Sequence, residues 1–257
     1  MKKKFPESKL AHKYLDGLKG LEIGGSIHNP FSLDTQNVDY TDEKTVFKEE
    51  EMDEQGMSLA VDIVAPGDEI PVAAESQDFV INSHVLEHFP DPINALKEWY
   101  RVVRPGGYIF MIVPHKERTF DRDQARTTVG ELQERYATKI FPKPHSKSQH
   151  YSFWTTGDFL ELVLSLKLDW KVVDFQDVDD KIGNGFAIVL KKEKAGREDI
   201  ERLMMEARKL KQQADSHQGN KFRRVVQLAG NAWRELRRNG IGGIWQRIKL
   251  MDKWDEK

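Results

Sequence analysis

The chain has 257 residues, of which 39% are hydrophobic and 32% are charged, and it contains no cysteine. This length fits one large domain or one domain with an appendage, and thirteen Phe and six Trp are enough to build a packed core. The lack of cysteine excludes disulfides, Cys-ligated zinc, iron–sulfur clusters and a thiol nucleophile.

The net charge of −2 is the sum of two parts of opposite sign. Residues 1–190 hold 22 Lys+Arg against 32 Asp+Glu, a balance of −10, whereas residues 191–257 hold 18 against 10, a balance of +8. We therefore expect the two parts to have different roles. Neither an apolar signal core near the basic N-terminus nor a run of about 20 apolar residues is present, so we expect a soluble, cytoplasmic protein.

Short apolar runs recur along the acidic part and predict strands, several of them rich enough in Val and Ile to be covered on both faces. The runs lie at residues 19–23, 37–40, 59–64, 79–82, 108–113, 170–175 and 186–190. Helical patterns lie between them, and the clearest covers Pro92 to Val103, where Asp91 can cap the helix. Strands that alternate with helices predict an α/β protein with a mostly parallel sheet.

Residues 114–157 interrupt this alternation with many polar groups, three prolines and six aromatic residues. A long insertion directly after a central strand lies at the carboxyl edge of the sheet, where α/β folds bind their ligands. Three histidines in it, His115, His145 and His150, favour a substrate lid over a plain surface excursion.

After Leu190, apolar residues at helical spacing predict a basic amphipathic helical tail over residues 193–257. Packing on the core or on a second copy of the chain is the expected role of this tail. A peripheral membrane contact through Phe222, Trp233 and Trp245 is the alternative. Nucleic acid is not expected as a partner, because the acidic residues 1–190 would repel phosphates.

Three segments carry a resemblance to a known family: Leu21 to Gly25, Asp78 to His88, and Leu96 to Tyr108. In order and spacing, they resemble the motifs of class I S-adenosylmethionine-dependent methyltransferases of the methyltransferase-11-like branch. The resemblance implies a Rossmann-like fold over residues 1–192, with a seven-stranded, mostly parallel sheet, an antiparallel last strand and helices on both faces. It also implies S-adenosyl-L-methionine as the cofactor.

The cofactor residues follow from these motifs. Glycines at a strand end let the backbone approach the methionine moiety, where a Cβ would collide with it. An acid after the second strand would hold the ribose hydroxyls, and Asp42 is favoured over Asp39. The predicted set is Glu22, Gly24, Gly25, Ser26, Asp42, Gly67, Asp68, Asn82, Ser83, His84, Leu86 and His88.

Two positions depart from the family pattern. Pro66 stands where relatives often place an adenine-binding Asp, so the backbone of Gly67 or the side chain of Asp68 is the expected substitute. Only eleven residues, broken by Pro30, separate Gly25 from Asn37, which leaves little room for the usual helix. A dinucleotide would miss that helix N-terminus, whereas S-adenosylmethionine carries no phosphate.

Methyl transfer needs an aligned acceptor and, for a hydroxyl, a base. His115 follows the fifth strand and is the first candidate, and His150 is the second. Arg118, Asp121 and Arg122 could hold a charged substrate, or they form a solvated face. No metal is expected, because His115 and His150 lack a carboxylate at the spacing of a known site.

The predicted reaction is methyl transfer to an oxygen or nitrogen of a small-molecule or glycan-type acceptor. Two alternatives stay open: a non-catalytic scaffold that acts through its basic tail, and a nicotinamide-dependent oxidoreductase.

Overall fold

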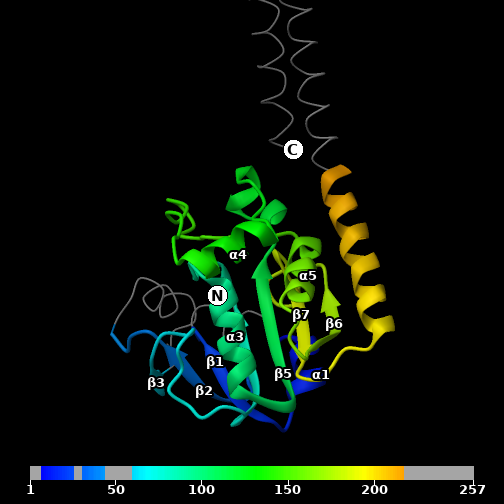
Figure 1. Ribbon diagram of the computed structural model, residues 1–257. Coiled ribbons are helices and arrows are strands. Elements are labelled where there is room, and N and C mark those ends of the chain that lie inside the picture. Colours follow the sequence, from blue (N-terminus) through cyan, green and yellow to red (C-terminus); the bar gives the residue numbers. More distant parts are fainter. Residues whose placement is uncertain (1–6, 26–30, 44–59, 217–257) are drawn as a thin grey trace, which may run out of the picture. The chain divides into compact units, whose positions relative to one another are not determined.

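The computed structural model describes residues 7–25, 31–43 and 60–216 (Figure 1). The chain divides into two compact units, residues 1–210 and 211–257, and the description below concerns the first. In chain order its elements are α1 (Lys9–Leu15), β1 (Lys19–Ile23), β2 (Asp34–Asp39), β3 (Ile63–Val64), β4 (Gln77–Ser83), η1 (Leu86–His88), α3 (Pro92–Val102), β5 (Val103–Pro114), η2 (Lys116–Arg118), η3 (Phe120–Asp123), α4 (Val129–Thr138), α5 (Thr156–Ser165), β6 (Lys171–Gln176) and β7 (Gly185–Lys191).

The strands form one seven-stranded sheet in the order β3-β2-β1-β4-β5-β7-β6. The pairs from β3 through β5 are parallel, and β7 runs antiparallel to both of its neighbours. The carboxyl ends of β1, β2 and β4 therefore meet at one edge, with the order reversing around β1 and β4. This topology confirms the predicted α/β fold, including its antiparallel last strand.

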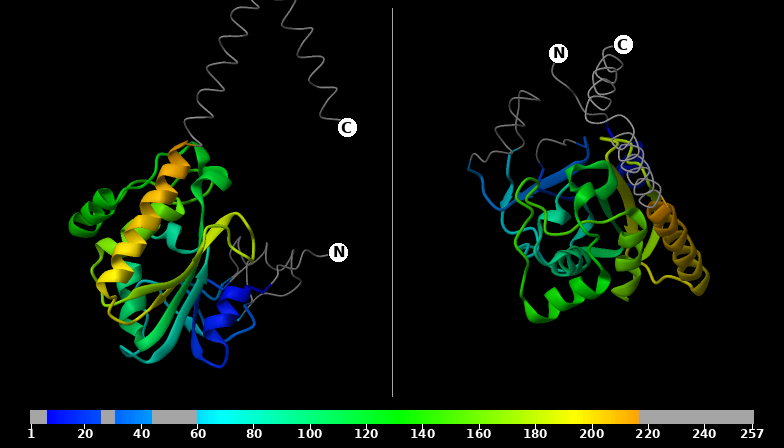
Figure 2. Two further views of the ribbon diagram at one scale, coloured as in Figure 1. Left: turned by 90° about the vertical axis from the view of Figure 1, so that its right-hand side faces the viewer. Right: turned by 90° about the horizontal axis from the view of Figure 1, so that it is seen from above.

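Helices cover both faces of the sheet (Figure 2). On one face, α3 and α5 bury Leu96, Trp99 and Phe159 against the strands. On the other face, α1 buries Leu10 and Leu15 in a smaller core. The burial of large side chains on both faces explains why the central strands read as continuous apolar runs rather than alternating ones.

The helix α3 follows its local sequence signals. The side chain of Asp91 accepts a hydrogen bond from the N–H of Asn94, and Pro92 occupies the first turn, where its missing N–H costs nothing. The helix ends at Val102, within one residue of the predicted end, and the chain enters β5 directly.

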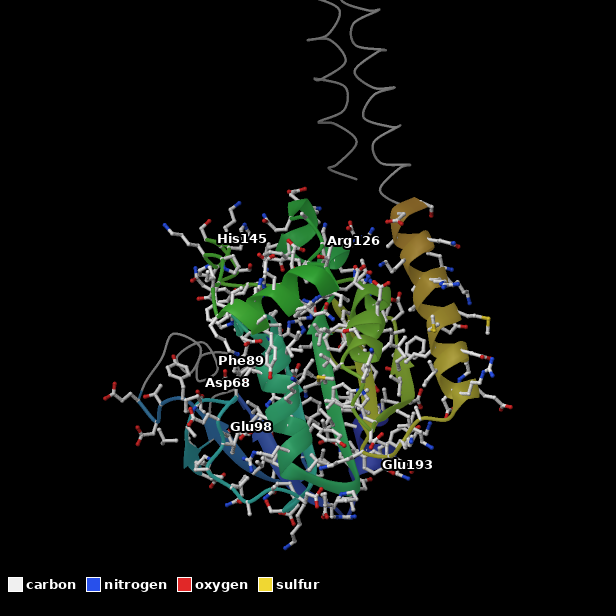
Figure 3. The ribbon with its side chains drawn as sticks, in the orientation of Figure 1. Asp68, Phe89, Glu98, Arg126, His145 and Glu193 are labelled. Atoms are coloured by element: carbon white, nitrogen blue, oxygen red, sulfur yellow. The ribbon has the colours of Figure 1, made fainter. Side chains whose placement is uncertain are left out.

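The insertion at residues 114–157 leaves the sheet at the carboxyl end of β5 and contains η2, η3 and α4. Its two ends are tied together, because His115 and Trp154 form a parallel bridge and the N–H of Lys116 donates to the carbonyl of Trp154. Figure 3 places His145 and Arg126 at this end of the molecule and Glu193 at the opposite end. The insertion is thus held over the edge where β1, β2 and β4 end.

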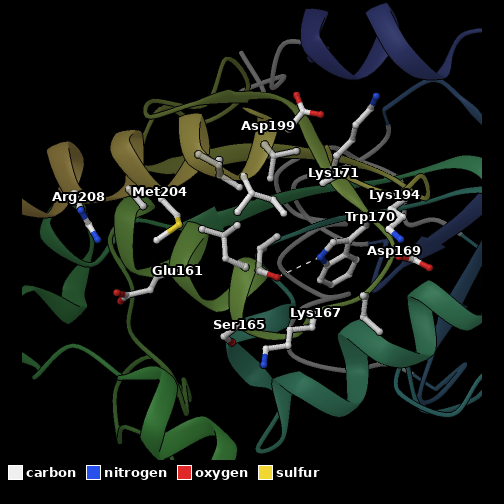
Figure 4. Close-up of a pocket in the computed structure, with 18 residues that line it drawn as sticks. Glu161, Ser165, Lys167, Asp169, Trp170, Lys171, Lys194, Asp199, Met204 and Arg208 are labelled. Atoms are coloured by element: carbon white, nitrogen blue, oxygen red, sulfur yellow. Dashed lines mark hydrogen bonds between the residues drawn. The ribbon is translucent and has the colours of Figure 1, made fainter. Parts of the chain in front are cut away.

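A helix begins at Arg197 and continues through residue 216. Within the first unit it packs on the domain, since Ala207 is buried and Leu203 and Leu210 contact the core. A cavity of about 580 Å³ lies between this helix, α5 and β6, beside the hydrogen bond from Trp170 Nε1 to the carbonyl of Val163 (Figure 4). Phe222, Trp233 and Trp245, on which the predicted membrane contact rests, lie outside the described residues.

Among the described residues, no helix is both long and apolar enough to cross a membrane.

Candidate functional site

A cavity of about 1150 Å³ opens at the carboxyl ends of β1, β2 and β4. The strand ends contribute Gly24, Asp39 and Ser83 to its lining. The insertion contributes residues 118–123 and also Ser148 and His150, so the predicted lid segment forms one side of the cavity. One cavity therefore joins the predicted cofactor end of the sheet to the polar insertion.

The glycine turn after β1 has the geometry that the sequence predicts. Gly24 has φ +63°, and a Cβ at this position would lie 3.0 Å from Cγ2 of Val85, which also lines the cavity. The next residue, Gly25, donates its N–H to Oδ1 of Asn37 at 3.0 Å, and Nδ2 of Asn37 donates to the carbonyl of Ala60 at 3.0 Å. Sequence reasoning did not identify Asn37 as a positioning residue, although a buried Asn in a strand is a signal for such a role.

The acid at the end of β2 is Asp39. We expected Asp42 to mark the end of this strand, and that expectation is wrong, because β2 ends three residues earlier. Asp39 lines the cavity, while Asp42 is exposed and is not among the lining residues. Pairing with β3 ends at Asp39 and Val64, which fixes where the chain leaves the sheet.

At the adenine end of the predicted site, Pro66 and Gly67 line the cavity. A Cβ on Gly67 would lie 2.7 Å from Cγ2 of Ile23. The carbonyl of Gly67 accepts a hydrogen bond from Nε1 of Trp99 at 2.7 Å. Asp68 instead accepts hydrogen bonds from Nδ2 of Asn94 with its carbonyl and its side chain, and it is not among the residues that line the cavity. Of the two proposed substitutes for the adenine carboxylate, Gly67 is the one beside the cavity.

The remaining predicted cofactor residues divide between the cavity wall and the layer behind it. Ser83, His84 and His88 line the cavity. Glu22 is buried behind it, with Oε2 accepting from the Thr35 hydroxyl at 3.2 Å, and Leu86 is in the core. Ser26 lies outside the described residues.

Buried polar atoms near the end of β4 lack protein partners. Neither amide atom of Asn82 nor the hydroxyl of Ser83 has a hydrogen-bond partner among the described residues. Such groups are costly to bury unless a ligand or water satisfies them. Together with the glycine turn and Asp39, they fit a cofactor that has both polar groups and a part needing close backbone approach, as S-adenosylmethionine does.

His115 caps η2, with Nδ1 accepting from the N–H of Glu117, and its ring packs edge-on against Phe186. It is only 7% exposed and is not among the residues that line the cavity. Burial lowers the pKa of His115 to about 4, so the imidazole is neutral at neutral pH. Its predicted role as the base stays a prediction.

In the wall of the same cavity, three histidines surround one buried carboxylate. Oε1 of Glu87 lies 3.9 Å from Nδ1 of His84, 3.9 Å from Nε2 of His88 and 3.8 Å from Nε2 of His150. The Glu87 side chain is fully buried, and this burial raises its pKa to about 7, although the nearby His150 opposes the rise. The N–H of Tyr151 donates to the carbonyl of Glu87 at 2.8 Å, which docks the insertion onto η1.

A second carboxylate orients His150. Oδ2 of Asp121 lies 2.7 Å from Nδ1 of His150, and Oδ1 accepts from the hydroxyl of Ser148 at 2.8 Å. Burial lowers the pKa of His150, but the bond to Asp121 and the charge of Glu87 outweigh it, so the pKa lies above its ordinary value. The rings of His88 and His150 meet edge to face with centroids 4.7 Å apart, and burial lowers the pKa of His88 to about 4.

This cluster changes the interpretation of the charged run in the insertion. Asp121 is buried and bound to His150, so it orients a cavity residue rather than presenting a charge to solvent. Arg118 bonds the carbonyl and side chain of Asp177. The sequence singles out the histidines and offers Asp121 as a possible contact to a charged substrate, but it does not predict that Glu87 and Asp121 meet His150, because nothing local shows this.

Comparisons with known proteins find similarity to methyltransferases. A demethylmenaquinone methyltransferase from Bacillus velezensis is 28% identical over 123 residues, which are 48% of this chain and 51% of that protein. The chain thus spans about half the length of this curated relative. A solved S-adenosylmethionine-dependent methyltransferase from Methanosarcina mazei is 18% identical with a TM-score of 0.48, covering 73% of this chain and 98% of the other. One from Thermotoga maritima is 17% identical with a TM-score of 0.45, covering 70% and 84%.

Residues 25–111 match the family model of a methyltransferase domain, the methyltransferase-11 family. This match begins at Gly25, directly after β1, and extends into β5, so it includes the ends of β2 and β4 and the Glu87-His88 pair that line the cavity. Residues 25–111 are thus similar to a methyltransferase domain of the methyltransferase-11 type, in agreement with the resemblance of the sequence motifs.

Proposed function

We propose that this protein transfers a methyl group from S-adenosylmethionine to an oxygen or nitrogen atom of a small-molecule or glycan-type acceptor. The observation that carries this proposal is one cavity whose lining combines two kinds of residue. Gly24, Asp39 and Gly67 are of the kind that the cofactor needs, and Glu87 with its histidines can handle a proton. A cofactor and an acceptor can therefore meet in one cavity.

When bound, S-adenosylmethionine supplies a methyl group that is already activated on a sulfonium, so the protein mainly has to align the acceptor and remove a proton. In the balanced reaction, the acceptor lone pair forms the new bond to the methyl carbon, the S–CH3 bond breaks with its electron pair on sulfur, and the acceptor proton goes to a base. The chain has to supply that base and exclude competing water.

His150 is the base that the geometry favours. It lines the cavity, and the bond from Nδ1 to Asp121 directs Nε2 toward Glu87, which lines the cavity as well. A carboxylate that fixes the tautomer and orientation of an imidazole in this way is a common arrangement for general bases. His115 has no such carboxylate and is packed behind the cavity wall.

Polar residues around the cavity support a polar acceptor. Arg122, Asp123 and Lys147 line the side contributed by the insertion. Hydroxyl-rich or amine-bearing molecules find hydrogen-bond partners there, whereas a purely apolar acceptor would leave these groups unsatisfied. This supports a glycan-type or other polar small molecule over an apolar one.

The test has two steps. Calorimetric titration with S-adenosylhomocysteine, with NAD as a comparison, measures which cofactor class binds. Incubation with methyl-labelled S-adenosylmethionine and a panel of glycans, phenols and amines then measures label transfer. We expect tight binding of S-adenosylhomocysteine, no binding of NAD, and label on a hydroxyl or amine.

Paired variants separate the two candidate bases. We expect His150→Ala to retain S-adenosylhomocysteine binding and to lose 100-fold or more of turnover, about the size of a general-base contribution. His115→Ala should lose much less, because its ring does not line the cavity. No binding of S-adenosylhomocysteine by the folded chain would favour the non-catalytic scaffold and refute this proposal.

A further inference from the structure

We propose that Glu87, His88 and His150 form a binding site for one divalent transition-metal ion. The similarity to methyltransferase domains does not imply such an ion. One ligand atom from each of these three side chains lies within 4.8 Å of the other two. We expected no metal from the sequence, where only His115 and His150 were compared. The tertiary structure instead brings the adjacent pair Glu87-His88 on η1 beside His150 on the insertion.

The distances are those of an open site that has to contract slightly around an ion. Oε1 of Glu87 lies 3.9 Å from Nε2 of His88 and 3.8 Å from Nε2 of His150. Bonds of 2.0–2.2 Å in tetrahedral geometry place ligand atoms roughly 3.4 Å apart. All three ligand atoms lie within 4.8 Å of one another, so side-chain movements of up to about 1 Å would bring them to this spacing.

The far nitrogens of both imidazoles are already held. Nδ1 of His150 lies 2.7 Å from the Asp121 carboxylate, and Nδ1 of His88 lies 3.3 Å from the carbonyl of Gln149. Metal-binding histidines usually donate their second N–H to a carboxylate or a carbonyl, which fixes the tautomer and aims the other nitrogen at the ion. Here both Nε2 atoms face the same carboxylate oxygen of Glu87.

The environment of the Glu87 side chain favours a bound cation. Its side chain is fully buried, and neither carboxylate oxygen has a hydrogen-bond partner among the described residues. A buried carboxylate is stable when it is neutralised, paired with a charge or bound to a metal. Coordination by an ion would satisfy Glu87 and both imidazoles at once.

The ligand set selects the class of ion. Two imidazoles and one carboxylate are typical of catalytic Zn²⁺ and related transition ions, whereas Mg²⁺ and Ca²⁺ prefer all-oxygen sites. Three protein ligands also leave a coordination position open. Glu87, His88 and His150 all line the cavity, so an oxygen ligand could reach that position from it.

This open position suggests a role for the ion, and that role rests on the proposed methyl transfer. An acceptor hydroxyl bound to the ion would lose its proton to solvent water at a lower pH, because the cation stabilises the oxyanion. Its oxygen lone pair would then form the O–CH3 bond while the S–CH3 bond breaks with its electron pair on sulfur. His150 would act as a ligand in this case, and proton removal would no longer depend on its basicity.

Metal binding is tested without any methyl transfer. The full-length chain is freed of metal with a chelator, returned to chelator-free buffer, and titrated with Zn²⁺ by calorimetry. A parallel titration with Co²⁺ is followed by visible absorption, because imidazole-bound Co²⁺ in a low-coordinate site has intense d–d bands. We expect one equivalent of each ion to bind and Zn²⁺ to raise the melting temperature.

Variants locate the ion. His88→Ala and His150→Ala should weaken Zn²⁺ binding by 100-fold or more and abolish the Co²⁺ bands, and Asp121→Asn should weaken binding by about 10–100-fold through the orientation of His150. His12→Ala is the matched control, because His12 also lies near two carboxylates, those of Glu7 and Asp16, but on α1. It should leave the single tight site unchanged.

Glu87→Gln, which keeps the shape of the side chain, decides the question if an alanine variant does not fold in the absence of metal. No stoichiometric Zn²⁺ binding by the wild-type chain would overturn the proposal, as would unchanged binding in Glu87→Gln. An equal loss in His12→Ala would also overturn it, because binding would then be at surface histidines. A chain that binds Zn²⁺ but not S-adenosylhomocysteine would keep this site and refute the proposed function.

Discussion

Replacing Gly24 by alanine tests whether the turn after β1 is a cofactor cradle or only a tight turn. Gly24 has φ +63° and lines the cavity. Gly17 offers a matched control, since it has φ +76° and a Cβ there would meet no atom within 4 Å. The two substitutions impose the same kind of backbone strain, but only Gly24→Ala adds a methyl group to a residue that lines the cavity.

The expected magnitudes follow from this difference. An L-residue in the left-handed region costs about 1–2 kcal/mol, so both variants should lose roughly that much stability. The added Cβ of Gly24→Ala would lie 3.0 Å from Cγ2 of Val85, which has to move by a few tenths of an ångström. The larger effect is on the ligand, where we expect at least a tenfold loss of affinity, or about 1.4 kcal/mol.

Urea denaturation of both variants gives the change in the free energy of unfolding, and calorimetric titration gives the dissociation constant for S-adenosylhomocysteine. Gly17→Ala should bind as tightly as the wild-type chain. If Gly24→Ala binds as tightly as Gly17→Ala at a similar loss of stability, the cofactor does not approach the backbone of this turn and the reasoning fails.

Three further predictions use the same two assays. Asp39→Asn should weaken S-adenosylhomocysteine binding by tenfold or more, whereas Asp42→Asn should not; the reverse result would restore the assignment made from sequence. Asn37→Ala should destabilise the chain by about 1–3 kcal/mol and weaken binding, since it removes the side chain that holds the glycine turn, and a loss of neither would contradict this role. Burial raises the pKa of Asp179, but bonds from four N–H groups in residues 181–185 outweigh it and lower the pKa. Its contribution to stability is therefore present above about pH 4, the unfolded value, and is lost as the pH falls through the lower folded pKa, so that Asp179→Asn should flatten the decline in stability below pH 4.

Elements with strong local signals could be predicted from the sequence. The helix Pro92–Val102 begins at the predicted residue, because Asp91 and Pro92 determine its start through their own side chains. It ends within one residue of the predicted limit. The turn at Gly24 was equally predictable, since a positive φ next to a packed side chain requires glycine. Strands β4, β5 and β7 were predictable because burial on both sides of the sheet leaves continuous apolar runs.

The end of β2 could not be predicted in this way. Asn37 to Asp42 alternates polar and apolar residues with two acids, and either acid could follow a strand. Pairing decides between them: Val38 lies opposite Ile63 and Asp39 opposite Val64, and the ladder stops there. The position of the acid relative to the cavity is thus a property of two strands, which no single segment contains.

The sequence by itself determined the fold, the methyltransferase motifs and the glycine turn, because each depends on residues that are neighbours in the chain or on one repeating pattern of burial. Only the tertiary structure decided which side chains surround Glu87 at the cavity. The Lys116–Trp154 and Tyr151–Glu87 backbone hydrogen bonds fold the insertion back onto η1 and bring His150 to Glu87. A contact of 3.8 Å between side chains so far apart in the chain leaves no trace in local spacing, since long-range packing alone sets that distance.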